Sequence, residues 1–224
     1  MTTDRRGQLQ SGGSAVPLKR WPLSGRAVRL ANVAEVDIKG DLHDYLQGAR
    51  ETLVWKLDGL REVDIRRPLT PTGTNLLGLV KHSTTSFVRY FGDVFSQPHE
   101  ITLAWQTLDA EPNAEFWATP EESRDELLAL YRHSWDLADT TITELPLDST
   151  GHVPWWGDTE VTLHHVLVHL TAETQRHAGH ADIVRELIDG TAGLLPQFDN
   201  LHLPDLASRK DFHDRVDDAA RLAD

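Results

Sequence analysis

The sequence predicts an all-α protein, a four-helix bundle with a long connection between its second and third helices. Four segments repeat apolar residues at spacings of three and four, which places one apolar stripe along each helix. No segment shows a strong alternation of apolar and polar residues, the pattern typical of a half-buried strand. Because each stripe must be buried against another, packing the four helices together is the expected arrangement.

The composition is that of one domain with an extension at each end. From the 224 residues we expect a partly ordered N-terminal arm over 1–38, a bundle over 39–192 and a C-terminal tail with a short helix over 193–224. The first residues lack the apolar stretch of a secretory signal, and no apolar run is long enough to span a membrane. We therefore expect a cytoplasmic protein. The formal net charge of -13 disfavours a nucleic-acid partner.

The chain contains no cysteine, which limits its chemistry. Disulfides, thiolate metal ligands and a cysteine nucleophile are all excluded. Metal ligands must come from histidine, aspartate or glutamate, and any thiol chemistry needs a thiol that arrives as a cosubstrate.

Caps and apolar stripes predict the first two helices. The first begins near Asp41 as N-cap and runs to about Leu60. The second begins after Thr74 as N-cap and runs to about Phe95. Both stripes consist of aliphatic and aromatic residues that recur every three or four positions, as expected for helices with one buried side.

His82 lies at the edge of the apolar stripe of the second helix. Its neighbours four residues away, Gly78 and Ser86, are both small, which predicts space around the imidazole. A glycine inside a helix costs ~1 kcal/mol relative to alanine, so we expect Gly78 to answer a packing or site requirement.

Residues 96–118 are too long for a tight turn between neighbouring helices. We interpret them as a crossover that covers one end of the bundle, with a short extended piece over 100–108. The third helix then begins with Thr119 as N-cap, Pro120 at N1 and Glu122 at N3, an arrangement that forms a capping box.

The fourth helix is predicted over residues 161–190 and carries five of the twelve histidines. Asp158 or Thr159 is the expected N-cap, and Gly190 is the glycine expected after the last turn. A last short helix is expected from about Ser208. The histidines make the fourth helix the main candidate for a functional site.

Four side chains lie on one face of the fourth helix at intervals of four residues: His165, His169, Glu173 and His177. They cannot all bind one ion, because two turns of helix span ~11 Å whereas metal–ligand bonds are ~2 Å long. Only a consecutive pair can chelate, and spacing alone does not choose among the three pairs. In a bundle, His82 can supply a further ligand to Glu173 and His177. An isolated pair of this kind is more often an ordinary core or surface feature.

Two segments resemble the DinB-like four-helix-bundle superfamily: TGTNLLGLVKHSTTSFVRYFGDVF and PWWGDTEVTLHHVLVHLTAETQRHAGHADIVRELIDG. Over roughly residues 40–192, the chain is most similar to the mycothiol-dependent branch of that superfamily, which includes mycothiol-dependent maleylpyruvate isomerase. The resemblance implies that His82, Glu173 and His177 hold a divalent metal. Many members use three histidines instead, so Glu173 is expected to alter the charge and the metal preference of the site.

The resemblance also implies a function, that of a metal-dependent thiol transferase. Zinc is the expected metal, and mycothiol the expected thiol, activated as a metal-bound thiolate for transfer to, or isomerisation of, a small electrophile. The same ligands also suit a non-haem iron enzyme, a metal-hydroxide hydrolase or acyl transferase, or a non-catalytic metal-binding bundle. Bundles of this type often pair, so a homodimer is among the expected assemblies.

Four further residues are candidates for binding the cosubstrate. Trp155 and Trp156 precede the fourth helix, where they either wall a pocket or plug the end of the bundle. Arg176 and Arg185 lie on the fourth helix near His177 and can contact a polar cosubstrate. Ion pairing on the helix surface is the more common role for such arginines.

Overall fold

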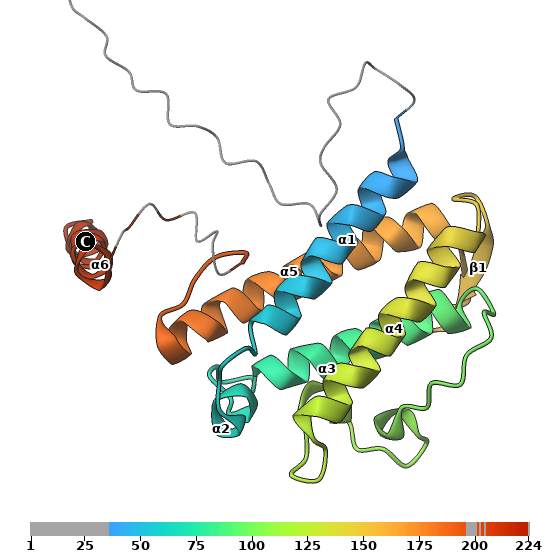
Figure 1. The fold of residues 1–224 in the computed structure, drawn as a ribbon, viewed down its shortest axis with the longest axis horizontal. Helices are drawn as coiled ribbons and strands as arrows, with labels where there is room; N and C mark the ends of the chain where they lie inside the picture. Colours follow the sequence, from blue (N-terminus) through green and yellow to red (C-terminus); the bar gives the residue numbers. More distant parts are fainter. Residues whose placement is uncertain (1–35, 196–200, 202, 204, 224) are drawn as a thin grey trace, which may run out of the picture.

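The computed structural model describes residues 36–195, 201, 203 and 205–223. Its four long helices form the predicted bundle: α1 (Ile38–Trp55), α3 (Leu76–Phe87), α4 (Arg124–Glu144) and α5 (Leu163–Asp189). Figure 1 shows α1 lying along α5 and α4 lying across α3. The helix α3 also packs against α5, and these two helices carry the candidate ligands. The all-α fold that the sequence predicts is therefore confirmed.

The apolar stripes of the four helices meet along the centre of the bundle. Each helix contributes side chains without exposed surface, among them Leu53 of α1, Val80 of α3, Tyr131 of α4 and Leu170 of α5. Burying a side chain of this size stabilises the fold by about 1.5–3 kcal/mol relative to leaving it exposed. The core therefore fixes which face of each helix points inward, and with it the direction of the polar side chains beside the stripe.

The first two long helices begin at caps other than those predicted. The carboxylate of Asp37 accepts a hydrogen bond from the amide of Gly40 at 2.8 Å, so α1 starts before Asp41. The side chain of Asn75 accepts a hydrogen bond from the amide three residues further on at 2.7 Å, so α3 starts one residue after a Thr74 cap would place it. Asp, Asn and Thr are all favoured N-caps, so sequence alone does not choose between candidates this close together.

The ends of these helices also differ from the prediction. The helix α1 ends at Trp55 rather than near Leu60, and the amides of Leu57 and Asp58 then bond to carbonyls three residues back in a turn that leads to Gly59, whose φ of 73° lies in the left-handed region. A short helix that was not predicted, α2 (Glu62–Arg66), follows this turn. The helix α3 continues into a π-helical turn, η1 (Val88–Asp93), and so ends close to the predicted position.

One of the two side-chain hydrogen bonds of the capping box predicted at Thr119 forms, but no helix starts there. The carboxylate of Glu122 accepts a hydrogen bond from the amide of Thr119 at 2.8 Å, as such a box requires. Glu122 also forms an ion pair with the buried Lys81 of α3, whose Nζ lies 2.7 Å from Oε1. The helix α4 begins one turn later, after Ser123, whose hydroxyl accepts from the amide of Glu126 at 3.2 Å. The contact with Lys81 thus keeps the first predicted turn in the connection.

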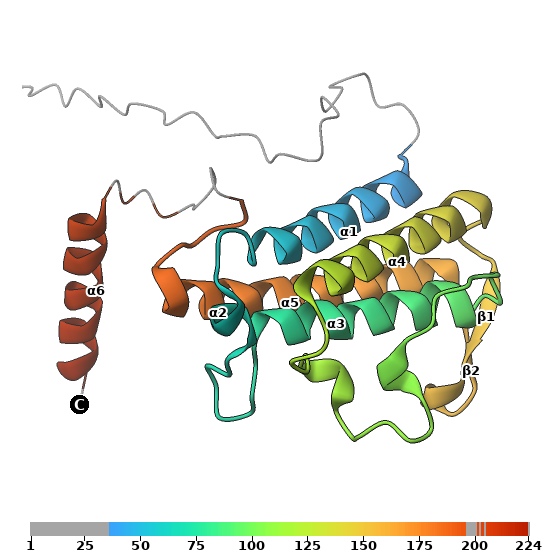
Figure 2. The ribbon, with the colours of Figure 1, turned by 60° about the horizontal axis from the view of Figure 1, so that its bottom comes forward.

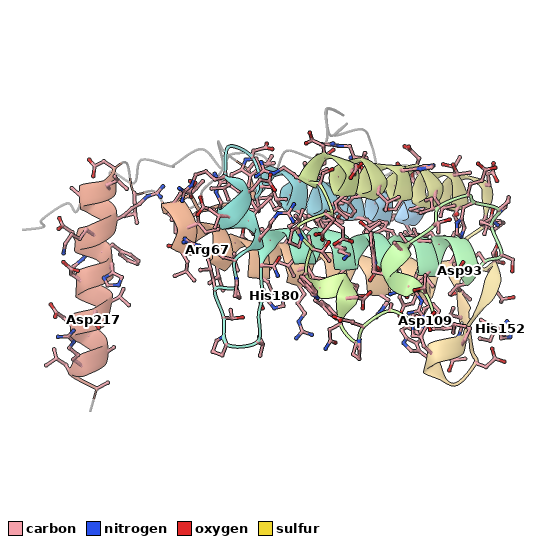
Figure 3. The ribbon with its side chains drawn as sticks, turned by 90° about the horizontal axis from the view of Figure 1, so that it is seen from below. Arg67, Asp93, Asp109, His152, His180 and Asp217 are labelled. Atoms are coloured by element: carbon pink, nitrogen blue, oxygen red, sulfur yellow. The ribbon has the colours of Figure 1, made fainter. Side chains whose placement is uncertain are left out.

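A two-stranded hairpin precedes α5, where the sequence predicts only a loop. The strand β1 (Thr150–Val153) pairs antiparallel with β2 (Thr159–Thr162), and a 3₁₀ turn, η4 (Pro154–Trp156), joins them. Each strand has only four residues, too few to show a clear alternation. In Figure 3, the labels of Asp93 and His152 mark the hairpin end of the bundle.

The helix α5 starts later than predicted and ends where predicted. Its N-cap is Thr162, whose hydroxyl accepts a hydrogen bond from the amide of His165 at 3.2 Å. Asp158, one of the two expected caps, lies instead in the hairpin turn with a φ of 59°. Gly190 follows the last helical turn with a φ of 74° and donates its amide hydrogen to the carbonyl of Glu186, as the sequence predicts.

The long connection covers a side of the bundle rather than one end of it. Figure 2 shows it passing beneath α3 on its way to α4. Within the extended piece expected over residues 100–108, residues Ala104–Gln106 form a 3₁₀ turn, η2, and a second 3₁₀ turn, η3 (Ala114–Phe116), follows further along the connection. The turn η3 packs directly against α3, so the connection reaches the helix that carries His82.

The helix α6 (Leu206–Arg221) contains the last helix expected from about Ser208. None of its side chains is buried, and Arg209 donates a hydrogen bond to the carbonyl of Gly190 at 2.7 Å. The arm expected over residues 1–38 falls almost entirely outside the described residues. Among the described residues, no helix combines the length and the apolar character that crossing a membrane requires.

Candidate metal centre

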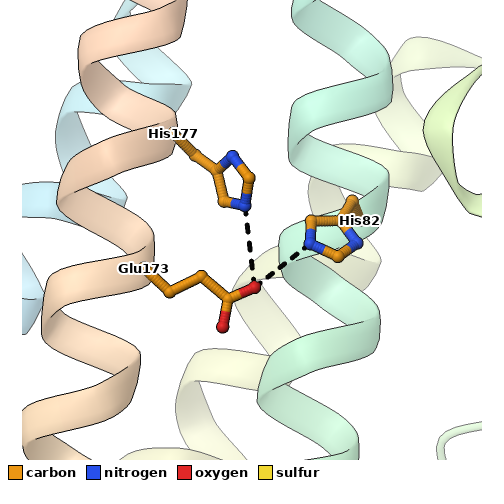
Figure 4. Close-up of side chains that lie close together, drawn as sticks. All are labelled: His82, Glu173 and His177. Atoms are coloured by element: carbon orange, nitrogen blue, oxygen red, sulfur yellow. Dashed lines mark hydrogen bonds and ion pairs between the residues drawn. The ribbon is translucent and has the colours of Figure 1, made fainter.

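Three polar side chains from α3 and α5 converge on one point between these helices. Figure 4 shows Glu173 and His177 of α5 and His82 of α3 pointing toward one another. The Oε1 atom of Glu173 lies 3.2 Å from Nε2 of His82 and 3.6 Å from Nε2 of His177. One nitrogen or oxygen of each residue lies within 4.8 Å of the others, and no other group of three in the described part of the chain offers metal ligands in this way.

The packing of α5 explains how its two residues reach α3. Glu173 and His177 lie one turn apart on the same face, beside the buried Thr174 and Ala178. The two imidazole side chains of the site are each 15% exposed and the Glu173 side chain is 24% exposed. The three groups are therefore shielded from bulk water on most sides, yet a small molecule can still approach them.

Glu173 has a third histidine beside it. Nε2 of His169, one turn earlier on α5, lies 3.3 Å from Oε2 of Glu173. One carboxylate oxygen thus faces His82 and His177, and the other faces His169. The structure brings the Glu173/His177 pair to His82, as the resemblance implies, and leaves His169 on the outer side of the carboxylate.

The electrostatics of the site follow from its close charges. Burial by itself lowers the pKa of His82, but the carboxylates of Glu115 and Glu173 outweigh burial and raise this pKa to about 9. Burial raises the pKa of Glu173, but His177 and His82 outweigh it and hold this pKa well below its ordinary value. The carboxylate is therefore ionised at neutral pH. A metal ion must displace the proton of His82, because only neutral imidazole is a ligand.

The donor set fits a divalent metal ion. Two imidazoles and one carboxylate are ligands that zinc accepts, and three protein ligands leave positions open for a small molecule. The Nδ1 atom of His177 is buried and has no hydrogen-bond partner among the described residues. The Nε2 atoms of both histidines face the shared carboxylate oxygen, so the three ligand atoms are directed at a common position.

Two residues of the connection, Glu115 and Phe116, contact His82, and neither is among the candidates that the sequence predicts. Oε1 of Glu115 lies 3.5 Å from Nδ1 of His82. The ring of Phe116 stacks on the imidazole, with centroids 4.6 Å apart and an interplanar angle of 25°. Both residues belong to η3, in a stretch without a periodic pattern. Nothing in the sequence relates them to His82 before the path of the connection is known.

An aromatic cluster lies beside the outer side of Glu173. Trp155 donates a hydrogen bond from Nε1 to the hydroxyl of Tyr90 at 3.0 Å. The ring of Trp156 lies edge-on to His169, with centroids 4.9 Å apart, and the ring of Tyr90 lies 5.2 Å from the same imidazole. His165, the first member of the predicted ladder, lies against Trp156. His169 thus lies between Trp156 and Glu173, and Trp155 lies behind Tyr90.

The two candidate arginines lie in different environments. Arg185 is buried and donates hydrogen bonds to Asp189 and to the carbonyls of Lys56 and Asp58. All three nitrogens of its guanidinium have partners, so its visible role is to tie α5 to the end of α1. Arg176 is exposed, close enough to His180 to contribute, after burial and His177, to lowering the pKa of that imidazole.

Comparison with known proteins identifies the family. No protein of curated function matches the chain. The crystal structure of a conserved protein from Enterococcus faecalis is similar, with a TM-score of 0.54 and 15% sequence identity over 70% of this chain and 100% of that chain. At this identity the likeness shows the fold alone. A family model described as mycothiol-S-transferase matches residues 41–190, which contain all four helices of the bundle except the first residues of α1. The chain therefore belongs to the mycothiol-S-transferase family, within the DinB-like superfamily.

Proposed function

We propose that this protein is a metal-dependent S-transferase that activates mycothiol at the site formed by His82, Glu173 and His177. The observation that supports this most directly is the convergence of two imidazoles and one carboxylate within 4.8 Å. The family description supplies the thiol and the type of transfer. Three protein ligands are typical of catalytic rather than structural zinc sites, which agrees with a site that binds a small molecule.

The charge of the ligand set suits an anionic sulfur atom. Two neutral imidazoles and one carboxylate bring the net charge with a divalent ion to about +1. A divalent ion held there would lower the pKa of a coordinating thiol from ~8.5, so that the thiol reacts as its thiolate. Glu173 stays ionised because the neighbouring histidines hold its pKa low, and it therefore remains a ligand at neutral pH.

The transfer step itself is a nucleophilic substitution or addition. The sulfur lone pair forms a bond to an electrophilic carbon, and the thiol proton leaves to solvent. Departure of a leaving group gives an S-conjugate of mycothiol. If the carbon–sulfur bond forms and breaks again, the thiol is regenerated and the electrophile is isomerised. We propose that Trp156 and Tyr90, which lie against His169, give the electrophile an apolar surface beside the ligands.

Zinc is the proposed metal, although the same donors suit other chemistry. Two histidines and one carboxylate also form the facial triad of non-haem iron(II) enzymes, and they can hold the metal of a hydrolase. The three functions differ in what they consume. The S-transferase needs a thiol, the iron enzyme needs oxygen, and the hydrolase turns over with neither.

The decisive experiment supplies each of these reactants in turn. The full chain is purified without oxygen, its bound metal is measured, and turnover of a chromogenic alkyl halide is followed with mycothiol, with glutathione and without thiol. We expect bound zinc, turnover with mycothiol, and no turnover without thiol or in the His82→Ala variant. The matched control His165→Ala should keep full activity. Bound iron with oxygen uptake, or turnover without any thiol, would replace the proposed function with one of the alternatives.

A further inference from the structure

The long connection contributes a charged group to the candidate metal centre. Glu115 lies on η3 and places Oε1 3.5 Å from Nδ1 of His82, a few tenths of an ångström beyond the usual hydrogen-bond distance. This buried nitrogen has no hydrogen-bond partner among the described residues, and the Glu115 carboxylate is the acidic group that it faces. The other nitrogen of the same ring, Nε2, faces Glu173 at 3.2 Å. The imidazole therefore lies between two carboxylates, one from the connection and one from α5.

Glu115 is itself held in place. Its second oxygen, Oε2, accepts a hydrogen bond from Nε2 of Gln106 in η2 at 3.3 Å. The ring of Phe116, the residue after Glu115, stacks on the imidazole of His82. The imidazole of His82 thus has a carboxylate beside each of its two nitrogens and an aromatic ring against its face, which leaves it little freedom to rotate. The two 3₁₀ turns thus act together on a single side chain of α3.

The connection can approach this closely because α3 carries a glycine at the contact. A Cβ atom on Gly78 would lie 1.9 Å from the carbonyl oxygen of Phe116, which no side chain allows. The side-chain amide of Asn75 donates to the same oxygen at 3.0 Å. One turn along, Nζ of the buried Lys81 donates to the carbonyl of Trp117 at 2.9 Å. The space beside His82 that the sequence predicts at Gly78 is therefore occupied by the backbone of η3.

We propose that Glu115 is a positioning residue, which accepts a hydrogen bond from Nδ1 of His82 and so directs Nε2 at the metal ion. This inference rests on the proposed metal site. It assigns Glu115 a role through His82, without contact to the thiol or the electrophile. A carboxylate on the far nitrogen of a ligating imidazole fixes its tautomer and orientation and increases its basicity. Loss of such a partner typically weakens metal binding 10–100-fold.

The test measures zinc affinity in the full chain by competition with a chromophoric chelator. Glu115→Ala should weaken binding by about 10–100-fold. Glu115→Gln should weaken it less, because the amide oxygen still accepts from Nδ1 while the negative charge is lost. The control Glu111→Gln removes an exposed carboxylate from the same connection and should leave the affinity unchanged. The isosteric glutamine variant guards against an effect of misfolding.

A second readout separates positioning from a general loss of structure. With Co²⁺ in place of zinc, the visible absorption bands report the ligand geometry. We expect altered bands in Glu115→Ala and wild-type bands in Glu115→Gln. If both variants bind zinc as tightly as the wild type and give the wild-type spectrum, the inference is wrong while the metal site stands. If the wild-type protein itself binds no zinc or other divalent metal, the proposed function fails, and this inference fails with it.

Discussion

At the scale of single residues, the packing of α1 against α4 includes a buried arginine whose partner is a partly exposed carboxylate. Arg50 of α1 is almost fully buried, and its guanidinium lies 2.7 Å from Asp139 of α4. His43, also on α1, contacts the same carboxylate at 2.8 Å. Burial raises the pKa of Asp139, but His43 and Arg50 outweigh it and lower this pKa below its ordinary 3.8. One carboxylate of α4 thus contacts an arginine and a histidine of α1 and joins the two helices.

The first prediction concerns the pH dependence of stability. Because the pKa of Asp139 is depressed in the folded state, its contribution is fully present above pH 3.8 and is lost as the pH falls through the lower folded value. We expect Asp139→Asn to lower the free energy of unfolding at pH 7 by about 1 kcal/mol, the low end of the range for leaving a buried charge unpaired, since the carboxylate is half exposed. Urea denaturation at pH 7 and at acid pH measures this.

The curves of the variant and the wild type should converge as the pH falls below 3.8. Asp136→Asn, which removes an exposed carboxylate from the same helix, serves as the control and should change little at either pH. The free energies of unfolding of Asp139→Asn and the wild type could instead differ as much at acid pH as at pH 7. That result would show that the ion pair is not the source of the difference.

At the scale of elements, long periodic segments were predictable and short or irregular ones were not. The stripes of α1, α3, α4 and α5 follow from sequence spacing, since burial in a bundle selects every third or fourth residue. The hairpin before α5 was missed because its strands have only four residues each. The helix α4 starts one turn later than its sequence predicts because Glu122, the N3 residue of the predicted capping box, pairs with Lys81 on α3.

Gly78 provides a prediction about how elements fit together. Gly78→Ala places a Cβ in the carbonyl of Phe116, so η3 must move away from α3. We expect a loss of stability of about 1–3 kcal/mol, typical of overpacking, together with weaker zinc binding as Glu115 leaves His82. Thermal unfolding and zinc titration measure the two effects.

The control is Gly48→Ala in α1, where an added Cβ meets no atom within 4 Å. The free energy of unfolding of this variant should rise by up to ~1 kcal/mol, because alanine has a higher helix propensity than glycine. The variant should bind zinc as the wild type does. If Gly78→Ala were as stable as Gly48→Ala and bound zinc normally, the close packing of η3 on α3 would not hold in solution.

At the scale of the whole molecule, the bundle brings together residues that lie far apart in the sequence. Spacing on α5 left three ligand pairs open, and only the resemblance selected Glu173/His177 with His82. The structure places these three side chains together, and binding of the metal stays a prediction. Glu115 could not be predicted, because its relation to His82 depends on the path of a 23-residue connection, residues 96–118, that carries no periodic signal.

The most direct test of the account is the metal content of five single variants of the full chain. After loading with zinc and removal of the excess, the wild type should hold one ion per chain. Three variants should hold none: His82→Ala, Glu173→Ala and His177→Ala. The two controls from the same helix face, His165→Ala and His169→Ala, should hold one ion each. The assignment would be contradicted if His169→Ala lost the metal while Glu173→Ala kept it.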